Sequence, residues 1–138
     1  MTQRIATTAQ EYYNNLVHFA YDGTFPSLAH GNDCMYRGDG TPSCHKRCAV
    51  GVQIPDEDYD ARMEHGSLKS MPARFIQKVR VPEGLTLQDL QNIQTYCHDK
   101  VAQKTGGWGG WNAEIFIERL NSQPCFANVV KVHPKTAV

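Results

Sequence analysis

The chain has 138 residues, of which 41% are hydrophobic and 20% are charged. This length and composition are typical of one globular domain (residues 1–138) and argue against a disordered chain. The 14 basic and 14 acidic side chains give no formal net charge, which argues against bulk nucleic-acid binding and electrostatic membrane binding. A neutral chain also lacks self-repulsion, so we expect a homo-oligomer.

The amino-terminal residues and the cysteines indicate a reducing compartment. Residues 1–10 are polar and lack the apolar segment of a secretory signal. No run approaches the roughly 20 apolar residues of a membrane helix, so we expect no membrane partner. The five cysteines are an odd number. We therefore expect a cytoplasmic protein with free thiols or a metal site in place of disulfides.

Apolar side chains at helical spacing, with capping residues before them, predict four helices. The first spans residues 8–21 and ends at an Asp-Gly pair. A short second helix covers 56–64, with acidic residues in its first turn, where the helix dipole favours them. The third runs from 86 to about 104, and the fourth from 112 to about 121. The residues of the fourth helix that we expect to face the core are Ile115, Phe116 and Leu120.

Between the first two helices, the sequence predicts a β-hairpin with a long connection. Residues 33–37 and 47–54 are the predicted strands, and 38–43 is a turn-forming cluster of Gly, Pro and Ser. The connection is too long for a two-residue turn, so we expect it to project from the surface. Residues 126–132 alternate weakly and suggest a further strand. We therefore predict an α+β fold, with three to four helices packed on a small antiparallel sheet.

The chemistry that we favour for this hairpin is phosphate or nucleotide recognition. Arginine offers a planar fork to phosphate oxygens, and exposed turn amides can cradle an anion. Tryptophans between glycines can stack on a base, which is worth roughly 1–3 kcal/mol per base. The predicted ligand-binding residues are Tyr36, Arg37, His45, Lys46, Arg47, His98, Trp108 and Trp111. In the alternative, Arg37 pairs with the acidic segment 56–64 and the tryptophans fill the core.

Three other kinds of chemistry are weaker predictions. Soft zinc ligands are present at Cys34, Cys44, His45, Cys48, Cys97 and His98. Their spacing is irregular, so we expect Cys34 and Cys48 to be small apolar residues of the core. Cys44 beside three basic residues, and the adjacent His98 and Asp99, are candidates for catalysis. We expect the acidic run at 56–64 to be a solvated helix face, and we predict no catalytic residue, no metal ligand and no cofactor.

Several short motifs follow one another along residues 10–120. They are Cys34, Tyr36, Arg37 and Gly38; Arg47, Cys48, Ala49, Val50 and Gly51; Ile54, Pro55, Asp56, Glu57 and Tyr59; Met63 and Glu64; and Leu90, Gln91, His98 and Asp99. This pattern resembles a family of small, largely uncharacterised proteins encoded by tailed bacteriophages. The resemblance implies a phage origin and a place in the host bacterial cytoplasm. Here Val52 stands where members often have a further cysteine, and the turn is longer, which counts against a metal site.

Taken with the resemblance, the residues predict a phage accessory protein that acts against host defence without catalysis. We expect it to bind and sequester a small anionic, nucleotide-like ligand such as an immune second messenger. The alternative is a protein–protein inhibitor of a host enzyme, in which the acidic run imitates nucleic-acid charge or an apolar patch docks. A zinc-binding protein, or a small hydrolase that uses Cys44 or the His98-Asp99 pair, is a third reading.

Overall fold

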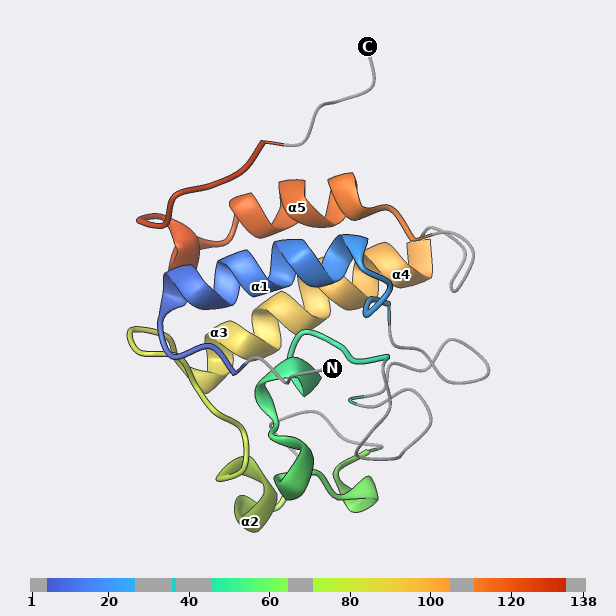
Figure 1. The fold of residues 1–138 in the computed structure, drawn as a ribbon, viewed down its shortest axis with the longest axis vertical. Coiled ribbons are helices and arrows are strands. Elements are labelled where there is room, and N and C mark those ends of the chain that lie inside the picture. The colour runs from blue at the N-terminus through green and yellow to red at the C-terminus, as the bar shows by residue number, and fades with distance from the viewer. Residues whose placement is uncertain (1–4, 27–35, 37–45, 65–70, 105–110, 134–138) are drawn as a thin grey trace.

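The computed structural model describes residues 5–26, 36, 46–64, 71–104 and 111–133 (Figure 1). Its α-helices are α1 (Ala9–Tyr21), α2 (Ala73–Ile76), α3 (Leu87–Asn92), α4 (Lys100–Lys104) and α5 (Ala113–Asn121). A π-helical segment, η5 (Ile93–Asp99), joins α3 to α4 in one continuous helix. Single 3-10 turns are η2 (Gly51–Gln53), η3 (Asp56–Asp58), η4 (Ala61–Met63) and η7 (Pro124–Phe126).

Helices α1, α3, α4 and α5 pack together at one end of the molecule, and the irregular segment 46–64 and the short helix α2 lie at the other (Figure 1). Helix α5 packs against both α1 and η5. The core contains side chains from all three of these elements, and five of its fully buried members are Tyr12, Leu16, Ile93, Phe116 and Leu120. Every helix in the described part of the chain is too short or too polar to cross a membrane.

The predicted helix boundaries at 8–21, 86–104 and 112–121 are confirmed, because the capping residues act as expected. The Thr8 hydroxyl accepts a hydrogen bond from the Glu11 amide, 3.1 Å away. Thr86 and Asp89 form a complete capping box at the start of α3. At the end of α1, Gly23 has a φ of 91°, a left-handed conformation that glycine adopts without strain.

The prediction of an antiparallel sheet is wrong for the part of the chain that the structure describes, which contains no strand. Thr8 and Glu83 form only an isolated parallel bridge. Within the predicted strand at 47–54, residues Gly51–Gln53 are the 3-10 turn η2. The other predicted strand, 33–37, lies outside the described residues except for Tyr36. The fold of the described residues is therefore helical and not α+β.

The predicted strand at 47–54 failed because its side chains are buried on every side. Residues from Cys48 to Ile54 are all at most 2% exposed. A continuous apolar run of this length predicts burial, but it does not distinguish a strand from another buried conformation. Its backbone forms local turns, such as the 3.0 Å bond from the Val52 amide to the Cys48 carbonyl.

Three smaller predictions also need correction. The acidic segment 56–64 forms the two turns η3 and η4 in place of one helix. Residues 126–132 form no strand and begin within η7. On α5, Ile115 is 37% exposed and Ile117 is fully buried, so the buried face is rotated from the predicted one.

Side chains from distant elements satisfy the main chain of the buried segment 48–54. The Tyr12 hydroxyl donates to the Ala49 carbonyl at 2.6 Å, and the Gln94 side-chain oxygen accepts from the Val50 amide at 3.0 Å. The Gln53 side chain pairs with both main-chain groups of Ala6, each at 3.0 Å. Buried backbone groups without partners are costly, so these side chains hold the irregular segment in place.

Candidate functional site

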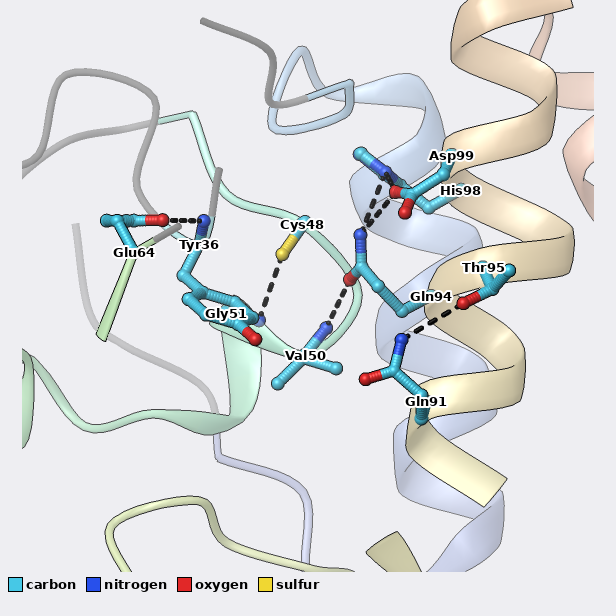
Figure 2. Close-up of polar contacts among 10 residues, drawn as sticks. All are labelled: Tyr36, Cys48, Val50, Gly51, Glu64, Gln91, Gln94, Thr95, His98 and Asp99. Atoms are coloured by element: carbon cyan, nitrogen blue, oxygen red, sulfur yellow. Dashed lines mark hydrogen bonds and ion pairs between the residues drawn. The ribbon is translucent and has the colours of Figure 1, made fainter. Parts of the chain in front are cut away.

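A buried polar cluster forms where the π-helical segment η5 meets the segment 46–54 (Figure 2). The Nδ1 atom of His98 lies 2.8 Å from Oδ1 of Asp99, and the side-chain amide of Gln94 donates to the same oxygen at 2.5 Å. In an α-helix, side chains three or four residues apart are neighbours. The wider π turn brings together residues that are five apart, and π turns occur often at functional sites.

The hydrogen bonds fix the orientation of this cluster. Gln94 must present its oxygen to the Val50 amide, so its nitrogen faces Asp99. The His98 Nδ1 atom lies 2.8 Å from the Asp99 carboxylate and 3.2 Å from the Gln94 nitrogen, and it donates to the carboxylate in the tautomer that carries its proton on Nδ1. The His98 side chain is fully buried, whereas that of Asp99 is 24% exposed. The carboxylate is therefore the part of this cluster that solvent reaches.

Aromatic rings surround His98. The Phe25 ring lies edge-on at 5.4 Å between centroids, and the Trp111 ring lies at 5.7 Å. Trp111 also contacts Phe116 at 5.3 Å, and its indole N–H donates to the Ala20 carbonyl at 3.0 Å. Two predicted ligand-binding residues, His98 and Trp111, are thus brought together. Trp111 packs against the core as in the alternative that we considered from the sequence.

A second polar group lies beside this cluster, around Glu64 (Figure 2). Its carboxylate accepts from the Tyr36 amide at 2.9 Å and from the Tyr59 hydroxyl at 2.6 Å. Tyr36 itself is only 7% exposed. Its carbonyl lies so close to Gly51 that a Cβ there would stand 2.2 Å from the oxygen, so this contact requires glycine. Tyr36 is therefore packed into the interior.

The thiol of Cys48 lies in the same region and is fully buried, as the sequence predicted for a small core residue. It accepts a 3.4 Å hydrogen bond from the Gly51 amide. Burial raises the pKa of the Cys48 thiol far above its ordinary value, and the carboxylates of Asp99 and Glu64 raise that pKa further. A thiol with a raised pKa is a poor nucleophile near neutral pH.

Arg47 forms an ion pair within its own chain. Its guanidinium lies 2.9 Å from the Asp56 carboxylate, and the side chains are 13% and 40% exposed respectively. Its amide donates to the Thr24 carbonyl at 3.1 Å. The neighbouring Lys46 is half-buried. Of the remaining predicted ligand-binding residues, Arg37, His45 and Trp108 lie outside the described residues.

The acidic run that follows is largely paired with basic side chains. Besides Asp56, the Asp58 carboxylate lies 3.6 Å from Lys78 and 3.1 Å from Arg80. The Asp60 carboxylate lies 2.7 Å from Arg62. This pairing reduces the surplus negative charge that an imitation of nucleic acid would need.

The described residues contain no group of three His, Cys, Asp or Glu side chains that could hold a metal ion. Cys48 and Cys97 are both buried. Burial raises the pKa of Cys97 to about 12, and the nearby Cys125 adds to the shift. The other candidate ligands for zinc, Cys34, Cys44 and His45, lie outside the part of the chain that the structure describes.

No family model, curated protein or solved structure matches this chain. The resemblance to the phage family therefore depends on the motif residues alone. Several of these motif residues meet in the structure. Tyr36, Cys48 and Gly51 contact one another around Glu64, and His98 and Asp99 belong to the neighbouring cluster.

Sequence reasoning did not identify Gln94, Phe25 or Glu64 as members of the site. Gln94 carried a usable signal, because it is a polar residue within the apolar stripe of a predicted helix. A buried amide must find hydrogen-bond partners. Gln94 lies four and five residues before His98 and Asp99, and this spacing indicated that these two residues are its partners. Glu64 was one of the motif residues of the phage-family resemblance but carried no sign of its partners, and Phe25 carried no comparable signal, since only the tertiary fold brings them to these positions.

Proposed function

We propose that this chain is a phage accessory protein that counters host defence by capturing a small nucleotide-type ligand, such as an immune second messenger. It would act in the host cytoplasm and hold the ligand without changing it chemically. The observation that supports this proposal is that the rings of His98 and Trp111 lie together, and that Arg47 is joined to them through Thr24 and Phe25. These residues come from three separate stretches of the chain, each selected from the sequence for its ability to contact such a ligand.

Thr24 and Phe25 form the link between the three stretches. The Thr24 carbonyl binds the Arg47 amide, and the next ring, Phe25, touches both His98 and Trp111. Thr24 is 2% exposed, and its hydroxyl has no hydrogen-bond partner among the described residues. An unsatisfied buried polar group costs about 1–3 kcal/mol. A hydroxyl or phosphate oxygen of a bound molecule would satisfy it.

A phosphate would have to compete for Arg47 with the Asp56 carboxylate. The carboxylate is the more exposed partner of the pair, so it can swing towards solvent while Arg47 stays in place. A phosphate offers several oxygens to the planar guanidinium fork, and it carries more charge than the carboxylate that it replaces. Asp56 therefore acts in this proposal as a displaceable counter-ion.

The environment of the reactive groups favours binding over chemistry. The Cys48 thiol is buried with a raised pKa, and the His98 ring is fully buried between aromatic side chains. A nucleophile or general base must reach the atom on which it acts, and it must be in the correct protonation state. Capture without turnover does not require a group in a reactive protonation state.

Two measurements test the proposal. Protein purified from phage-infected bacteria is denatured, and its small-molecule extract is analysed by mass spectrometry. In parallel, the melting temperature of the purified protein is measured with cyclic nucleotides and with ADP-ribose derivatives. We expect a nucleotide in the extract and a rise in melting temperature with the same class of compound. An empty extract together with no thermal shift would refute capture.

A matched pair of variants locates the site. Arg47→Ala removes the guanidinium that would bind the phosphate and should abolish the thermal shift. Arg74→Ala removes an equal charge from the exposed helix α2, where Arg74 lies 4.6 Å from the Phe75 ring, and should leave the shift unchanged. Equal loss in both variants would indicate a general charge effect and no defined site.

The alternative, inhibition of a host enzyme by docking, is supported by exposed aromatic and aliphatic side chains. Tyr21 is 57% exposed, Tyr96 is 51% exposed and Ile115 is 37% exposed. Aromatic residues are enriched in protein–protein interfaces. A pull-down from host lysate separates the two proposals, because a stoichiometric protein partner would favour docking and a bound nucleotide would favour capture.

A further inference from the structure

We call the segment 129–132 the strap. Its main-chain groups form hydrogen bonds with side chains of helix α1 and of the last residue of helix α5, and these bonds hold the strap on the two helices. At Val130, both main-chain groups pair with the side-chain amide of Gln10. The Val130 amide donates to the Gln10 oxygen at 2.7 Å, and the Gln10 nitrogen donates to the Val130 carbonyl at 3.1 Å. One glutamine side chain thus pairs with both main-chain groups of a single residue, as the facing residue of an antiparallel strand would.

Two residues further on, Val132 is held in the same way. Its amide donates to the Tyr13 hydroxyl at 2.9 Å, and its carbonyl accepts from the Asn121 side-chain nitrogen at 2.8 Å. The Tyr13 hydroxyl in turn donates to the Asn121 oxygen at 2.6 Å. Tyr13 and Asn121 therefore form one unit that recognises the main chain of a single residue.

This arrangement recognises alternate residues through their backbone and makes little use of their side chains. Val130 is 79% exposed and Val132 is 45% exposed, whereas Val129 is packed against the core. The weak alternation in 126–132 thus has a counterpart in the structure, although the partners are helix side chains and not a strand. A strap that buries so little apolar surface is held mainly by its hydrogen bonds, which water can replace.

The strap leaves the core through a short exposed hinge. Phe126 is fully buried and anchors η7, and Ala127 and Asn128 after it are exposed. Opening this hinge would free the strap and would cost only the contact of Val129 with the core. The site on α1 and α5 would then lose the strap as a partner of Gln10, Tyr13 and Asn121, although Gln10 would keep its bond to Asn14 and Tyr13 its bond to Asn121.

We propose that the strap exchanges between two copies of this chain, so that each copy's strap occupies the site on α1 and α5 of the other. The strap of a second copy fits the site because it is chemically identical to the one already bound. Exchange of an identical element is a low-cost route to a dimer, and short hinges favour it. The absence of net charge removes the long-range repulsion that would oppose the approach of two copies.

The test uses full-length chains and light scattering coupled to size exclusion. We expect the wild-type chain to pass from monomer to dimer as its concentration rises. Val130→Pro removes the amide that binds Gln10 and should prevent dimerisation. Val130→Ala keeps that amide and removes only an exposed side chain, so it should dimerise like the wild type. Circular dichroism checks that each variant keeps its helices.

Mixing two defective chains provides a sharper test. Val130→Pro has an intact site and a defective strap, whereas Gln10→Ala has an intact strap and a defective site. Each should be monomeric alone, and the mixture should give a heterodimer in native mass spectrometry, because one intact strap then meets one intact site. An excess of a synthetic peptide with the sequence of residues 127–133 should dissociate the wild-type dimer.

Two results would overturn the proposal. One is a wild-type chain that remains monomeric at every concentration. The other is a Val130→Pro dimer as stable as the wild-type dimer, which would place the contact elsewhere.

Discussion

Gln94 is the residue that joins the two halves of the molecule. Its side-chain oxygen satisfies the Val50 amide in the irregular segment, and its nitrogen supports Asp99 in the π-helical segment. The residue is only 5% exposed, so water cannot replace it at either contact without a rearrangement of the core. A single amide therefore sets the position of the candidate site relative to the helices.

We expect Gln94→Leu to lower the free energy of unfolding substantially. It leaves the buried Val50 amide without its partner, which costs about 1–3 kcal/mol, and it also removes one donor from the partly exposed Asp99. Urea denaturation followed by circular dichroism measures the loss. Gln88→Leu is the matched control, because Gln88 is exposed and bonds only a neighbouring side chain at 2.8 Å. Equal losses of unfolding free energy in both variants would show that the hydrogen bonds of Gln94 contribute no more to stability than that of Gln88.

The Cys97 thiol gives stability a defined dependence on pH. Burial raises its pKa in the folded protein to about 12, whereas an unfolded thiol titrates at about 8.5. The folded state thus binds the proton more tightly. The contribution of the protonated Cys97 thiol to the free energy of unfolding is complete below the pKa of the unfolded state. That contribution disappears as the pH rises from about 8.5 to about 12.

Cys97→Ala should therefore flatten the loss of stability at alkaline pH. Over that range, we expect the free energy of unfolding to fall less steeply in the variant, by up to about 1.4 kcal/mol per pH unit. The slope against pH is the quantity to compare, since the cavity left by the substitution lowers stability equally at every pH. Parallel curves for the two proteins would contradict the assigned pKa.

At the scale of elements, the π-helical segment η5 is what creates the candidate site. It contains one turn that is wider than an α-helical turn, and the α-helices continue on both sides of it. Within that turn, five-residue spacing brings Asp99 to Gln94. An unbroken α-helix over residues 87–104 would point these two side chains in different directions.

A deletion within η5 should be tolerated better than one in a regular helix. Removing Tyr96, which is 51% exposed, shortens the wide turn to an α-helical one and leaves the flanking helices in register. Removing Asn14 from α1 rotates every later residue of that helix by about 100° relative to the core. We expect a much smaller fall in melting temperature for the first deletion, and equal falls would argue against this interpretation of η5.

The sequence predicted the helices well because their signals are local. Thr8, Thr86 and Asn112 cap helices where capping residues were expected. The segment 48–54 could not be predicted in this way, because its conformation depends on Tyr12 and Gln94 from distant parts of the chain. The sequence analysis also missed the π turn. A π turn contains only one residue more than an α-helical turn, so the spacing of apolar residues along the helix changes very little.

The candidate site was predictable only in part. His98 and Trp111 were selected from the sequence, and the structure places their rings in contact. What the sequence could not show is that His98 is fully buried and Trp111 partly buried, or that Arg47 already has a carboxylate partner in Asp56. Whether a side chain faces a ligand or its own chain is decided by the tertiary fold.

At the scale of the whole molecule, the proposed capture depends on the competition between Asp56 and an incoming anion. Asp56→Asn should strengthen nucleotide binding by a factor of roughly 1.4 to 5, as expected if a partly exposed ion pair worth about 0.2–1 kcal/mol no longer opposes binding. Isothermal titration calorimetry with the ligand found in the extract measures the change. Asp58→Asn removes the same charge from the same run and serves as the control, since Asp58 pairs with Lys78 and Arg80. Equal effects of the two substitutions would contradict a specific role for Asp56.

The dependence of segment 48–54 on distant side chains also constrains how the chain can be assembled during translation. Val50 leaves the ribosome 44 residues before Gln94, its hydrogen-bond partner. Until η5 has emerged and become helical, the Val50 amide has to remain bonded to water, and the apolar side chains around it lack the part of their cover that η5 supplies. We therefore expect this segment to be among the last parts of the nascent protein to resist proteolysis, although it lies in the first half of the sequence.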